Sequence, residues 1–418
     1  MDINKLLLEM GKNARSAART LSGATPAQKN DALERVSRSL RDSAAELITE
    51  NEKDLAAGEK AGLTSAMLDR LKLTEKRIED MAVAVDEVAA LPDPVGEVTG
   101  VWTRPSGFKV GRMRAPIGVI GIIYESRPNV TIDAAALCLK SGNACILRGG
   151  SEAINSNHAL AQLFSECVTE TGLPSGTVQG VPTTDREAVR ALLKADDYVD
   201  LIIPRGGKGL IRMIMVNSTI PVIKHLDGIC HTYVDSGAVE KMAIDVCINA
   251  KLDRPGTCNA METMLVHRDM AGSFLPEVLE RFKKEGVEIR GCPRTREKTP
   301  WVIEASDEDW ATEHLDRILN VKVVDSMNEA MEHIARYGSA HTDVIITMNH
   351  ANAQRFTREV DSAAVMVNAS SRLHDGFVFG LGAEIGISTD KLHARGPMGL
   401  VELTTEKWIV LGEGHLRE

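Results

Sequence analysis

Short apolar runs that alternate with segments of helical period are the feature that most constrains the fold of this chain. In the first half, apolar runs at 117–123, 144–147, 198–203 and 221–223 alternate with helical segments at 131–140 and 152–170. The pattern resumes after residue 234, with helical segments at 238–252 and 273–284 around an apolar run at 262–266. Parallel strands need crossover connections, which are usually helices. The sequence therefore predicts an α/β protein with parallel sheets covered by helices on both faces.

The two ends of the chain have other patterns. The first ninety residues are helical in period, with a capping signal at Thr25, Pro26 and Gln28 and a last helical turn near Leu91. Two extended runs between 95 and 114 flank a turn-like Arg-Pro-Ser-Gly, which indicates a hairpin. The tail at 400–409 is also extended in pattern. We expect the hairpin and the tail to form a small separate sheet, and we expect a domain boundary near residues 235–237.

Charge and composition exclude several classes of protein. The 418 residues include 49 Lys and Arg against 59 Asp and Glu, a formal net charge of −10 without the basic block that nucleic acid or an anionic membrane would require. The longest apolar runs are far shorter than the roughly 20 residues of a membrane span. The chain does not begin like a signal peptide, and we expect a cytoplasmic location. Seven cysteines without CxxC or zinc-like spacing predict free thiols and no metal site.

Cys258 is the candidate nucleophile of the sequence. It lies in Arg-Pro-Gly-Thr-Cys-Asn at 254–259, between a helical segment and an apolar run. A cysteine at a helix start would gain thiolate character from the helix dipole. The alternative is a small buried hydrophobic residue, which is the interpretation we favour for the cysteines at 138, 145, 167 and 247.

Two turns have compositions that suit phosphate groups. A predicted strand runs into a turn with Gly206, Gly207 and Lys208, whose backbone NH groups could hold a pyrophosphate, although the turn lacks GxGxxG. An ordinary strand-to-helix turn is the alternative there. Arg148 ends another predicted strand, where its guanidinium could hold a phosphate in a two-point contact. A solvated surface arginine is the alternative for Arg148.

An amide and three histidines complete the set of candidates. Asn129 follows the first predicted strand of the sheet, at the carboxyl edge where open α/β sheets bind ligands. Its amide could stabilise an oxyanion, although a turn asparagine is the commoner explanation. His341, His374 and His393 lie in a polar, glycine-rich region, where they are either exposed loop residues or substrate contacts.

Taken together, these segments resemble the aldehyde dehydrogenase superfamily and, more closely, its γ-glutamyl phosphate reductase family, essentially from end to end. The most specific stretches are Tyr-Glu-Ser-Arg-Pro-Asn-Val at 124–130, Leu-Asp-Arg-Pro-Gly-Thr-Cys-Asn at 252–259, Tyr-Gly-Ser-Ala-His-Thr-Asp at 337–343 and Phe-Gly-Leu-Gly-Ala-Glu-Ile-Gly-Ile-Ser-Thr at 379–389. Several motifs in the right order make an accidental similarity improbable.

The resemblance implies an activity and a domain plan. The implied reaction is NADPH-dependent reduction of L-glutamyl 5-phosphate to L-glutamate 5-semialdehyde, with release of phosphate through a cysteine thioester, as the second step of proline biosynthesis from glutamate. The implied plan is a cofactor domain over 1–235 with an oligomerisation hairpin at 95–115, a catalytic domain over 236–370, and a return to the cofactor domain with a C-terminal oligomerisation strand over 371–418. A homo-oligomer is expected, with glutamate 5-kinase as a further candidate partner.

The resemblance also implies residue roles. Cys258 falls on the nucleophile and Asn129 on the oxyanion amide. Arg148 matches the position that contacts the adenosine ribose, usually a Lys in the superfamily, and the turn with Gly206, Gly207 and Lys208 is assigned to the cofactor. Glu313 resembles the carboxylate that holds the nicotinamide ribose, although its surroundings depart from the usual motif. Candidates for holding the amino-acid part of the substrate are Arg127, Arg372, Gly380 and Glu384.

One departure from the superfamily pattern bears on mechanism. Hydrolytic aldehyde dehydrogenases have a Glu before Leu-Gly-Gly that activates water, whereas this chain has His225-Leu-Asp-Gly. A phosphorylating enzyme needs no such base, because phosphate is itself the nucleophile or the leaving group. Two rival hypotheses stay open: a hydrolytic or CoA-acylating aldehyde dehydrogenase, and a non-catalytic scaffold that binds glutamate 5-kinase.

Overall fold

The chain forms two compact units in the computed structural model, which describes residues 2–417 except residue 126 of the 124–130 motif. Unit 1 comprises residues 1–224, 380–386 and 398–418, and unit 2 comprises residues 225–379 and 387–397. Unit 2 therefore begins at His225 rather than after residue 235, because the strand at 230–234 pairs within the second sheet. The C-terminal region likewise alternates between the units instead of returning once at residue 371. Among the described residues, no helix is long and apolar enough to cross a membrane.

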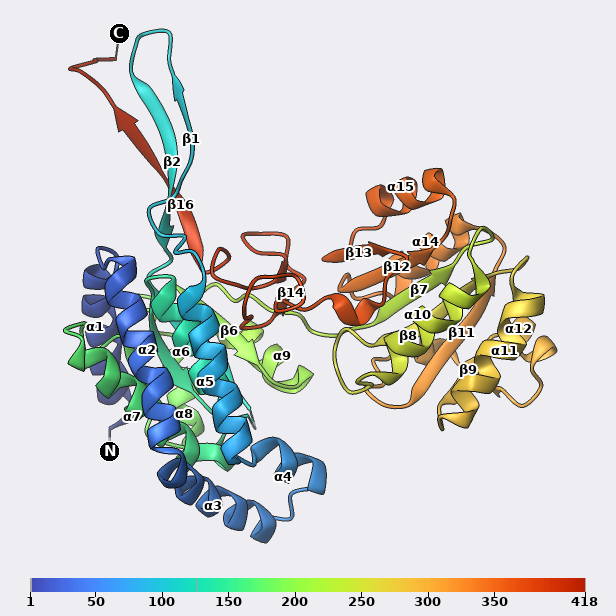
Figure 1. Ribbon diagram of the computed structural model, residues 1–418, viewed down its shortest axis with the longest axis horizontal. Helices are drawn as coiled ribbons and strands as arrows, with labels where there is room; N and C mark the ends of the chain where they lie inside the picture. The colour runs from blue at the N-terminus through green and yellow to red at the C-terminus, as the bar shows by residue number, and fades with distance from the viewer. Residues whose placement is uncertain (1, 126, 418) are drawn as a thin grey trace. The chain divides into compact units, whose positions relative to one another are not determined.

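Unit 1 starts with five helices (Figure 1). They are α1 (Ile3–Leu21), α2 (Pro26–Asp42), α3 (Ala44–Lys60), α4 (Ser65–Leu71) and α5 (Glu75–Ala90). The capping signal predicted for α2 is confirmed: Thr25 Oγ1 accepts from Gln28 N, and Gln28 Oε1 accepts from Thr25 N. α5 ends at Ala90, directly before the predicted stop, since proline at 92 and 94 cannot continue a helix.

The sheet of unit 1 is parallel, as the alternation of apolar and helical segments predicts. Its order is β5-β4-β3-β6, with β3 (Val119–Tyr124), β4 (Ala144–Arg148), β5 (Val178–Gly180) and β6 (Leu201–Arg205). The connecting helices are α6 (Asn129–Lys140), η1 (Ser151–Ala153), α7 (Ile154–Glu170), α8 (Arg186–Leu192) and α9 (Lys208–Asn217). Every residue of β3 and β4 is buried, which explains their continuous apolar composition. The run at 221–223 makes only a single bridge, between Val222 and Ile202.

The predicted small sheet is confirmed. β1 (Val98–Thr103) and β2 (Lys109–Pro116) form the hairpin, and β16 (Thr404–Leu411) pairs antiparallel with β2 in the order β1-β2-β16. Figure 1 shows the late strand, in red, beside the early hairpin, in cyan. Apolar side chains of β16 at Trp408, Val410 and Leu411 are largely exposed.

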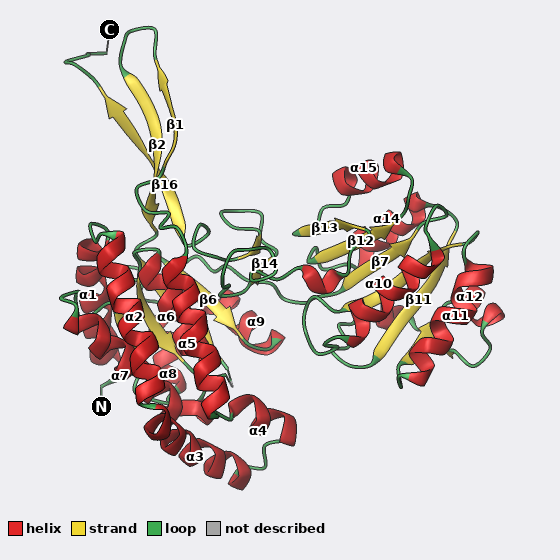
Figure 2. Cartoon of the chain, viewed as in Figure 1, coloured by secondary structure: helices red, strands yellow, loops and turns green. Residues whose placement is uncertain are grey.

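Unit 2 is built on a second sheet, drawn in yellow in Figure 2. The sheet is parallel, with strand order β10-β9-β11-β8-β7-β12-β13. Its strands are β7 (Cys230–Val234), β8 (Met261–His267), β9 (Glu288–Gly291), β10 (Ile303–Glu304), β11 (Ile318–Val324), β12 (Thr342–Ile346) and β13 (Ala364–Val367). Its helices are α10 (Glu240–Leu252), α11 (Ala271–Lys284), α12 (Pro293–Lys298), α13 (Asp307–Trp310), α14 (Met327–Tyr337), α15 (His350–Glu359) and η2 (Ser371–Leu373). A two-stranded pair, β14 (Ile387–Ser388) and β15 (Gly396–Pro397), completes the unit.

Alternate side chains of these strands pack into two cores. Val234, Met264 and Val344 pack with α10 and α11 in one core, whereas their neighbours Tyr233 and Leu265 pack with α14 and α15 in the other. The alternation follows from the two-residue period of a strand. Because both faces are covered, the strand ends are the accessible parts of the sheet, and the loops at those ends carry the candidate residues.

An ion pair lies inside unit 2, where α10 meets β8. Lys251 Nζ is 2.9 Å from Glu262 Oε2, and both side chains are fully buried. Glu262 Oε1 also accepts a hydrogen bond from Leu315 N at 3.1 Å. Burial raises the pKa of Glu262 to about 7 and lowers the pKa of Lys251, and each partner's charge opposes the shift of the other. Each charge therefore depends on its partner to remain inside the protein.

We predict that Glu262→Gln destabilises the protein strongly, because Lys251 is left as an unpaired buried charge. The expected loss is about 3 to 5 kcal/mol of unfolding free energy. The control is Asp245→Asn, which breaks the exposed pair with Lys241 on the same helix and should cost less than about 1 kcal/mol. Urea unfolding of both variants gives the comparison, and equal shifts of the unfolding midpoint would contradict the prediction.

Candidate active site

Cys258 lies in the turn that joins α10 to β8. Thr257 N and Thr257 Oγ1 both bond to Arg254 O, and Ala260 N bonds to Thr257 O, so the segment is a series of turns. The thiol is partly exposed, unlike the fully buried cysteines at 138, 145, 230 and 247. Cys258 lies between a helix and a strand, as the sequence predicts, and no helix starts at it, so a helix dipole gives it no thiolate character. Any thiolate character must come from neighbouring side chains instead of a helix dipole.

The Cys258 turn is held from the segment around η2. Asn259 Nδ2 donates to His374 O at 3.0 Å, and Arg372 Nη1 donates to Asn259 Oδ1. Arg372 Nε also donates to Asp253 Oδ2 at 3.0 Å. Arg372, a candidate for holding the substrate, therefore braces both ends of the turn that carries Cys258.

Gly228 presses against the backbone of Cys258. A Cβ atom placed on Gly228 would lie 2.0 Å from Cys258 O, so no other residue fits there. Gly228 N donates to Glu313 Oε1 at 2.8 Å, and Cys230 Sγ donates to Cys258 O at 3.1 Å. Glu313, which the family resemblance assigns to the nicotinamide ribose, thus holds the backbone of Gly228, the residue that contacts Cys258.

Two imidazoles lie beside the Cys258 thiol, and a third imidazole, His374, packs against one of them. The ligand atoms of His225, Cys258 and His341 all lie within 4.8 Å of one another, and the ring centroids of His341 and His374 are 5.2 Å apart. His225 Nδ1 is 2.7 Å from Ile387 O, a carbonyl that can only accept, so Nδ1 carries the hydrogen and the lone pair of the neutral ring is on Nε2. This tautomer suits His225 to accept the thiol proton.

His341 and His374 are both buried, so the alternative that they are exposed loop residues is wrong. Thr342 Oγ1 lies 2.7 Å from Nδ1 of each ring and links them. Burial lowers the pKa of His341 well below its ordinary value and lowers that of His374 to about 4, so both rings are neutral at pH 7. His393, in contrast, is exposed.

Arg148, in unit 1, is not the solvated surface residue of the alternative interpretation. Its side chain is mostly buried, with Nη1 donating to Gly149 O at 2.7 Å and Nη2 to Thr184 O at 3.0 Å, whereas Nε has no hydrogen-bond partner. Burial lowers its pKa from the ordinary value. A guanidinium buried at a strand end and bonded only to carbonyls has capacity left for an anion.

The glycine-rich turn after β6 already holds an anionic group. Gly207 N donates to Glu125 Oε2 at 2.9 Å, and the same oxygen would lie 2.4 Å from a Cβ placed on Gly206. Gly206, Gly207 and Lys208 are all exposed, and α9 begins at Lys208. The backbone of the turn therefore bonds to a carboxylate of the chain itself, and phosphate binding at this turn stays a prediction.

Asn129 is the first residue of α6 and lies beyond the carboxyl end of β3, as expected. Its side chain is exposed, and Nδ2 donates to Asp133 Oδ2 at 2.9 Å. Burial raises the pKa of Asp133 to about 6 against the opposing effects of Asn129 and Arg205. The amide is thereby oriented by a carboxylate one helical turn away.

The predicted residues are divided between the units. Cys258, Glu313 and Arg372 belong to unit 2, where they form one connected group through Gly228 and Asn259. Unit 1 contains the others, namely Arg127, Asn129, Arg148, Gly206, Gly207, Lys208, Gly380 and Glu384. Arg127 and Gly380 are exposed, and Gly380 has a φ of +79°, a conformation that favours glycine.

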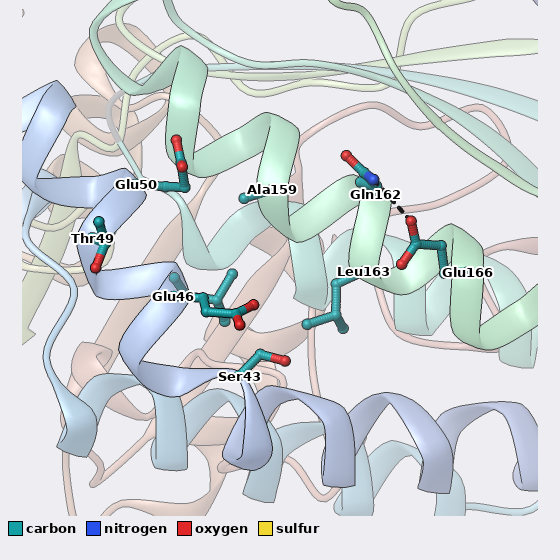
Figure 3. A pocket seen from close by; sticks show the side chains of 9 residues that line it. Ser43, Glu46, Thr49, Glu50, Ala159, Gln162, Leu163 and Glu166 are labelled. Atoms are coloured by element: carbon teal, nitrogen blue, oxygen red, sulfur yellow. Dashed lines mark hydrogen bonds between the residues drawn. The ribbon is translucent and has the colours of Figure 1, made fainter.

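A pocket between α3 and α7 contains none of these residues (Figure 3). Glu46, Glu50 and Glu166 contribute three carboxylates to its lining. These charges would repel a phosphate or a pyrophosphate. The pocket is therefore unsuitable for the phosphate groups considered above for Arg148 and for the turn at 206–208.

Glu125, Asp133 and Thr342 contact candidate site residues, and the sequence patterns did not single them out. Glu125 and Thr342 lie inside the specific stretches 124–130 and 337–343, where Arg127 and His341 were selected. Their position within those stretches is the sequence signal by which Glu125 and Thr342 could have been identified. Asp133 lies outside the stretches, four residues after Asn129, which is the spacing of neighbours on a helix.

Comparison with known proteins shows the family of this chain. The aldehyde dehydrogenase family model matches residues 7–296. The γ-glutamyl phosphate reductase of Moorella thermoacetica is 56% identical over 408 residues, covering 98% of each chain, and that of Magnetococcus marinus is 58% identical, covering 100% of this chain and 99% of the other.

Comparison with solved structures indicates the same family. The crystal structure of γ-glutamyl phosphate reductase from Thermotoga maritima, 48% identical, matches with a TM-score of 0.97 over 99% of this chain and 100% of that chain. An acetylating aldehyde dehydrogenase from Geobacillus thermoglucosidasius, 16% identical, shares the fold with a TM-score of 0.70, covering 100% of this chain and 98% of the other. The chain belongs to the aldehyde dehydrogenase family and, within it, to the γ-glutamyl phosphate reductases.

Proposed function

We propose that this protein reduces L-glutamyl 5-phosphate to L-glutamate 5-semialdehyde with NADPH, releasing phosphate, in proline biosynthesis. The observation that carries the proposal is that relatives more than 50% identical over essentially the whole chain are named γ-glutamyl phosphate reductase. The partly exposed Cys258 thiol, with His225 beside it, supplies the nucleophile and the base that a thioester route needs.

The chain's own residues carry out the acyl transfer. His225 Nε2 accepts the Cys258 proton, and the thiolate attacks the acyl carbon of the substrate. The C–O bond to phosphate breaks, phosphate leaves, and a thioester remains on Cys258. Asn129, oriented by Asp133, is proposed to donate to the oxyanion during this step and the next. When the thiohemiacetal collapses, the C–S bond breaks, the aldehyde is released, and the thiolate is regenerated.

Unit 1 fits a nicotinamide dinucleotide, which supplies the hydride that reduces the thioester when it is bound. Gly207 N already bonds to a carboxylate oxygen and can hold a phosphate oxygen in the same way. Arg148 has an unpartnered buried Nε and a charge that suits the adenosine 2′-phosphate of NADP. Lys208 adds positive charge at the turn, and Glu313 is proposed to accept from the nicotinamide ribose.

Arg127, Arg372, Gly380 and Glu384 stay candidates for binding the amino-acid part of the substrate. The exposed apolar side chains of β16 support a homo-oligomer formed through the three-stranded sheet, because a protein seldom leaves Trp408, Val410 and Leu411 in water together. We also propose a cytoplasmic location, and glutamate 5-kinase as the source of the labile acyl phosphate.

We predict that Cys258→Ala abolishes turnover, by at least about a thousandfold, because the covalent step has no other nucleophile. The assay is reduction of NADP in the presence of glutamate 5-semialdehyde and phosphate, with cofactor binding and folding measured in parallel. Cys292→Ser is the control, since this half-buried thiol lies elsewhere in unit 2 and should retain activity. An active Cys258→Ala enzyme would move the nucleophile to another residue, and inactivity of the unmodified protein would favour the scaffold hypothesis.

Oxidation of the semialdehyde should require phosphate or arsenate. Once His225 holds the thiol proton it cannot also deprotonate water, and a carboxylate base is missing at this position, so the thioester persists until phosphate attacks. The measurement is the rate of NADP reduction with and without phosphate, and His225→Glu should raise the phosphate-independent rate. Rapid production of free glutamate by the unmodified protein without phosphate would restore the hydrolytic alternative, and a requirement for CoA would restore the acylating one.

We predict that Arg148→Ala lowers the preference for NADPH over NADH about tenfold or more, the effect of losing a charged hydrogen-bonded contact of roughly 1.5 to 3 kcal/mol. The quantity to measure is the ratio of kcat/KM for the two cofactors, which cancels a general loss of stability. An unchanged ratio would assign the 2′-phosphate to another group, and Lys208 and Arg205 are the next to replace.

A further inference from the structure

The group of His225, Cys258 and His341 has the composition of a metal-binding site. Two imidazoles and one thiol bring their ligand atoms within 4.8 Å of one another, and among the described residues this is the one such group of His, Cys, Asp and Glu. No pair of these three positions has a zinc-like spacing in the sequence, because the fold brings together a loop before β7, the α10–β8 turn and the residue before β12.

Each imidazole offers one ligand atom. His225 Nδ1 carries the hydrogen that bonds to Ile387 O, so Nε2 is the nitrogen of this ring that can bind a metal. His341 is completely buried and its Nε2 has no hydrogen-bond partner, whereas its Nδ1 lies 2.7 Å from Thr342 Oγ1. Thr342 in turn contacts His374. The second ring nitrogen of His341 therefore has a hydrogen-bonding partner that fixes the ring, as metal-binding histidines usually have.

The nature of the ligands selects the metal. Sulfur with two imidazoles favours Zn²⁺ over Mg²⁺ or Ca²⁺, which prefer oxygen. Tetrahedral Zn²⁺, about 2.3 Å from sulfur and 2.0 to 2.1 Å from nitrogen, holds its ligand atoms about 3.3 to 3.6 Å apart, so the ligand atoms need to approach one another by no more than about 1.5 Å. Cys230 is an unsuitable fourth ligand, because its thiol donates to Cys258 O and burial raises its pKa. A water molecule would complete the site.

We propose that Zn²⁺ binds to Cys258, His225 and His341 and reversibly inhibits the enzyme. On binding, the S–H bond of Cys258 breaks, a Zn–S bond forms, and the proton passes to solvent without any change of oxidation state. The bound sulfur donates electron density to the metal and is a weaker nucleophile toward an acyl carbon, and His225 no longer accepts a proton because its Nε2 lone pair is bound to the metal. The metal site rests on the geometry alone, whereas the inhibition rests on the proposed role of Cys258.

The test uses Co²⁺ as a spectroscopic probe in place of Zn²⁺, with the full-length reduced protein. Titration should show about one Co²⁺ per chain with a thiolate-to-metal charge-transfer band, and Zn²⁺ should displace it. The band should be lost in Cys258→Ala and retained in the control Cys292→Ser. Thr342→Val keeps the shape of the side chain but removes the support of His341, and its Co²⁺ affinity should fall about tenfold or more.

The outcomes separate the two parts of the proposal. A band that is absent in the unmodified protein, or that survives in Cys258→Ala, overturns the metal site. If Co²⁺ and Zn²⁺ bind as expected but Zn²⁺ leaves turnover unchanged, the inhibitory role is overturned. Inhibition that a chelator reverses, with the predicted changes in the variants, supports both parts. A separate measurement tests the proposed function: activity that survives in metal-free Cys258→Ala would contradict the proposed role of Cys258, whatever the metal results are.

Discussion

The contact of Gly228 with the Cys258 carbonyl is the constraint on which the site in unit 2 depends. Two backbones approach so closely that a single Cβ atom would overlap the carbonyl oxygen. The approach brings His225, three residues before Gly228, to the thiol, and it aims the Gly228 NH at Glu313. Contacts of this kind are set by main-chain atoms, which have no rotamers to relax, so the backbone position of Cys258 is defined before any ligand enters.

Much of the fold could be predicted from local patterns in the sequence. The α2 capping box, the end of α5 before two prolines, and the hairpin turn each depend on residues within a few positions of one another. The parallel sheets followed from the alternation of apolar runs with helices, since few other arrangements bury continuous apolar strands. The pairing of β16 with β2 was also expected, from two extended segments that matched nothing else in the chain.

The parts that sequence patterns could not supply depend on contacts between distant residues. The position of Cys258 between a helix and a strand was predicted, but the imidazoles beside its thiol were not, because His225 and His341 are distant from it in the sequence. His341 and His374 are polar residues in glycine-rich segments, yet the Thr342 hydroxyl and neutral rings make their burial acceptable. The boundary at His225 was missed because β7 joins the second sheet through its neighbours β8 and β12, which come later in the chain.

The three-stranded sheet has a consequence for synthesis of the chain. Arg114 Nη1 in β2 bonds to Thr404 Oγ1 at the start of β16, and the two residues are 290 positions apart. At roughly 5 to 20 residues per second, a ribosome needs about 15 to 60 s to make the chain between them. Until then one edge of β2 has no partner strand, a state that invites pairing with other nascent chains. Arg112 and Arg114 on that edge, with Lys109 at its end, are charges of the kind that oppose such pairing while the partner strand is still being made.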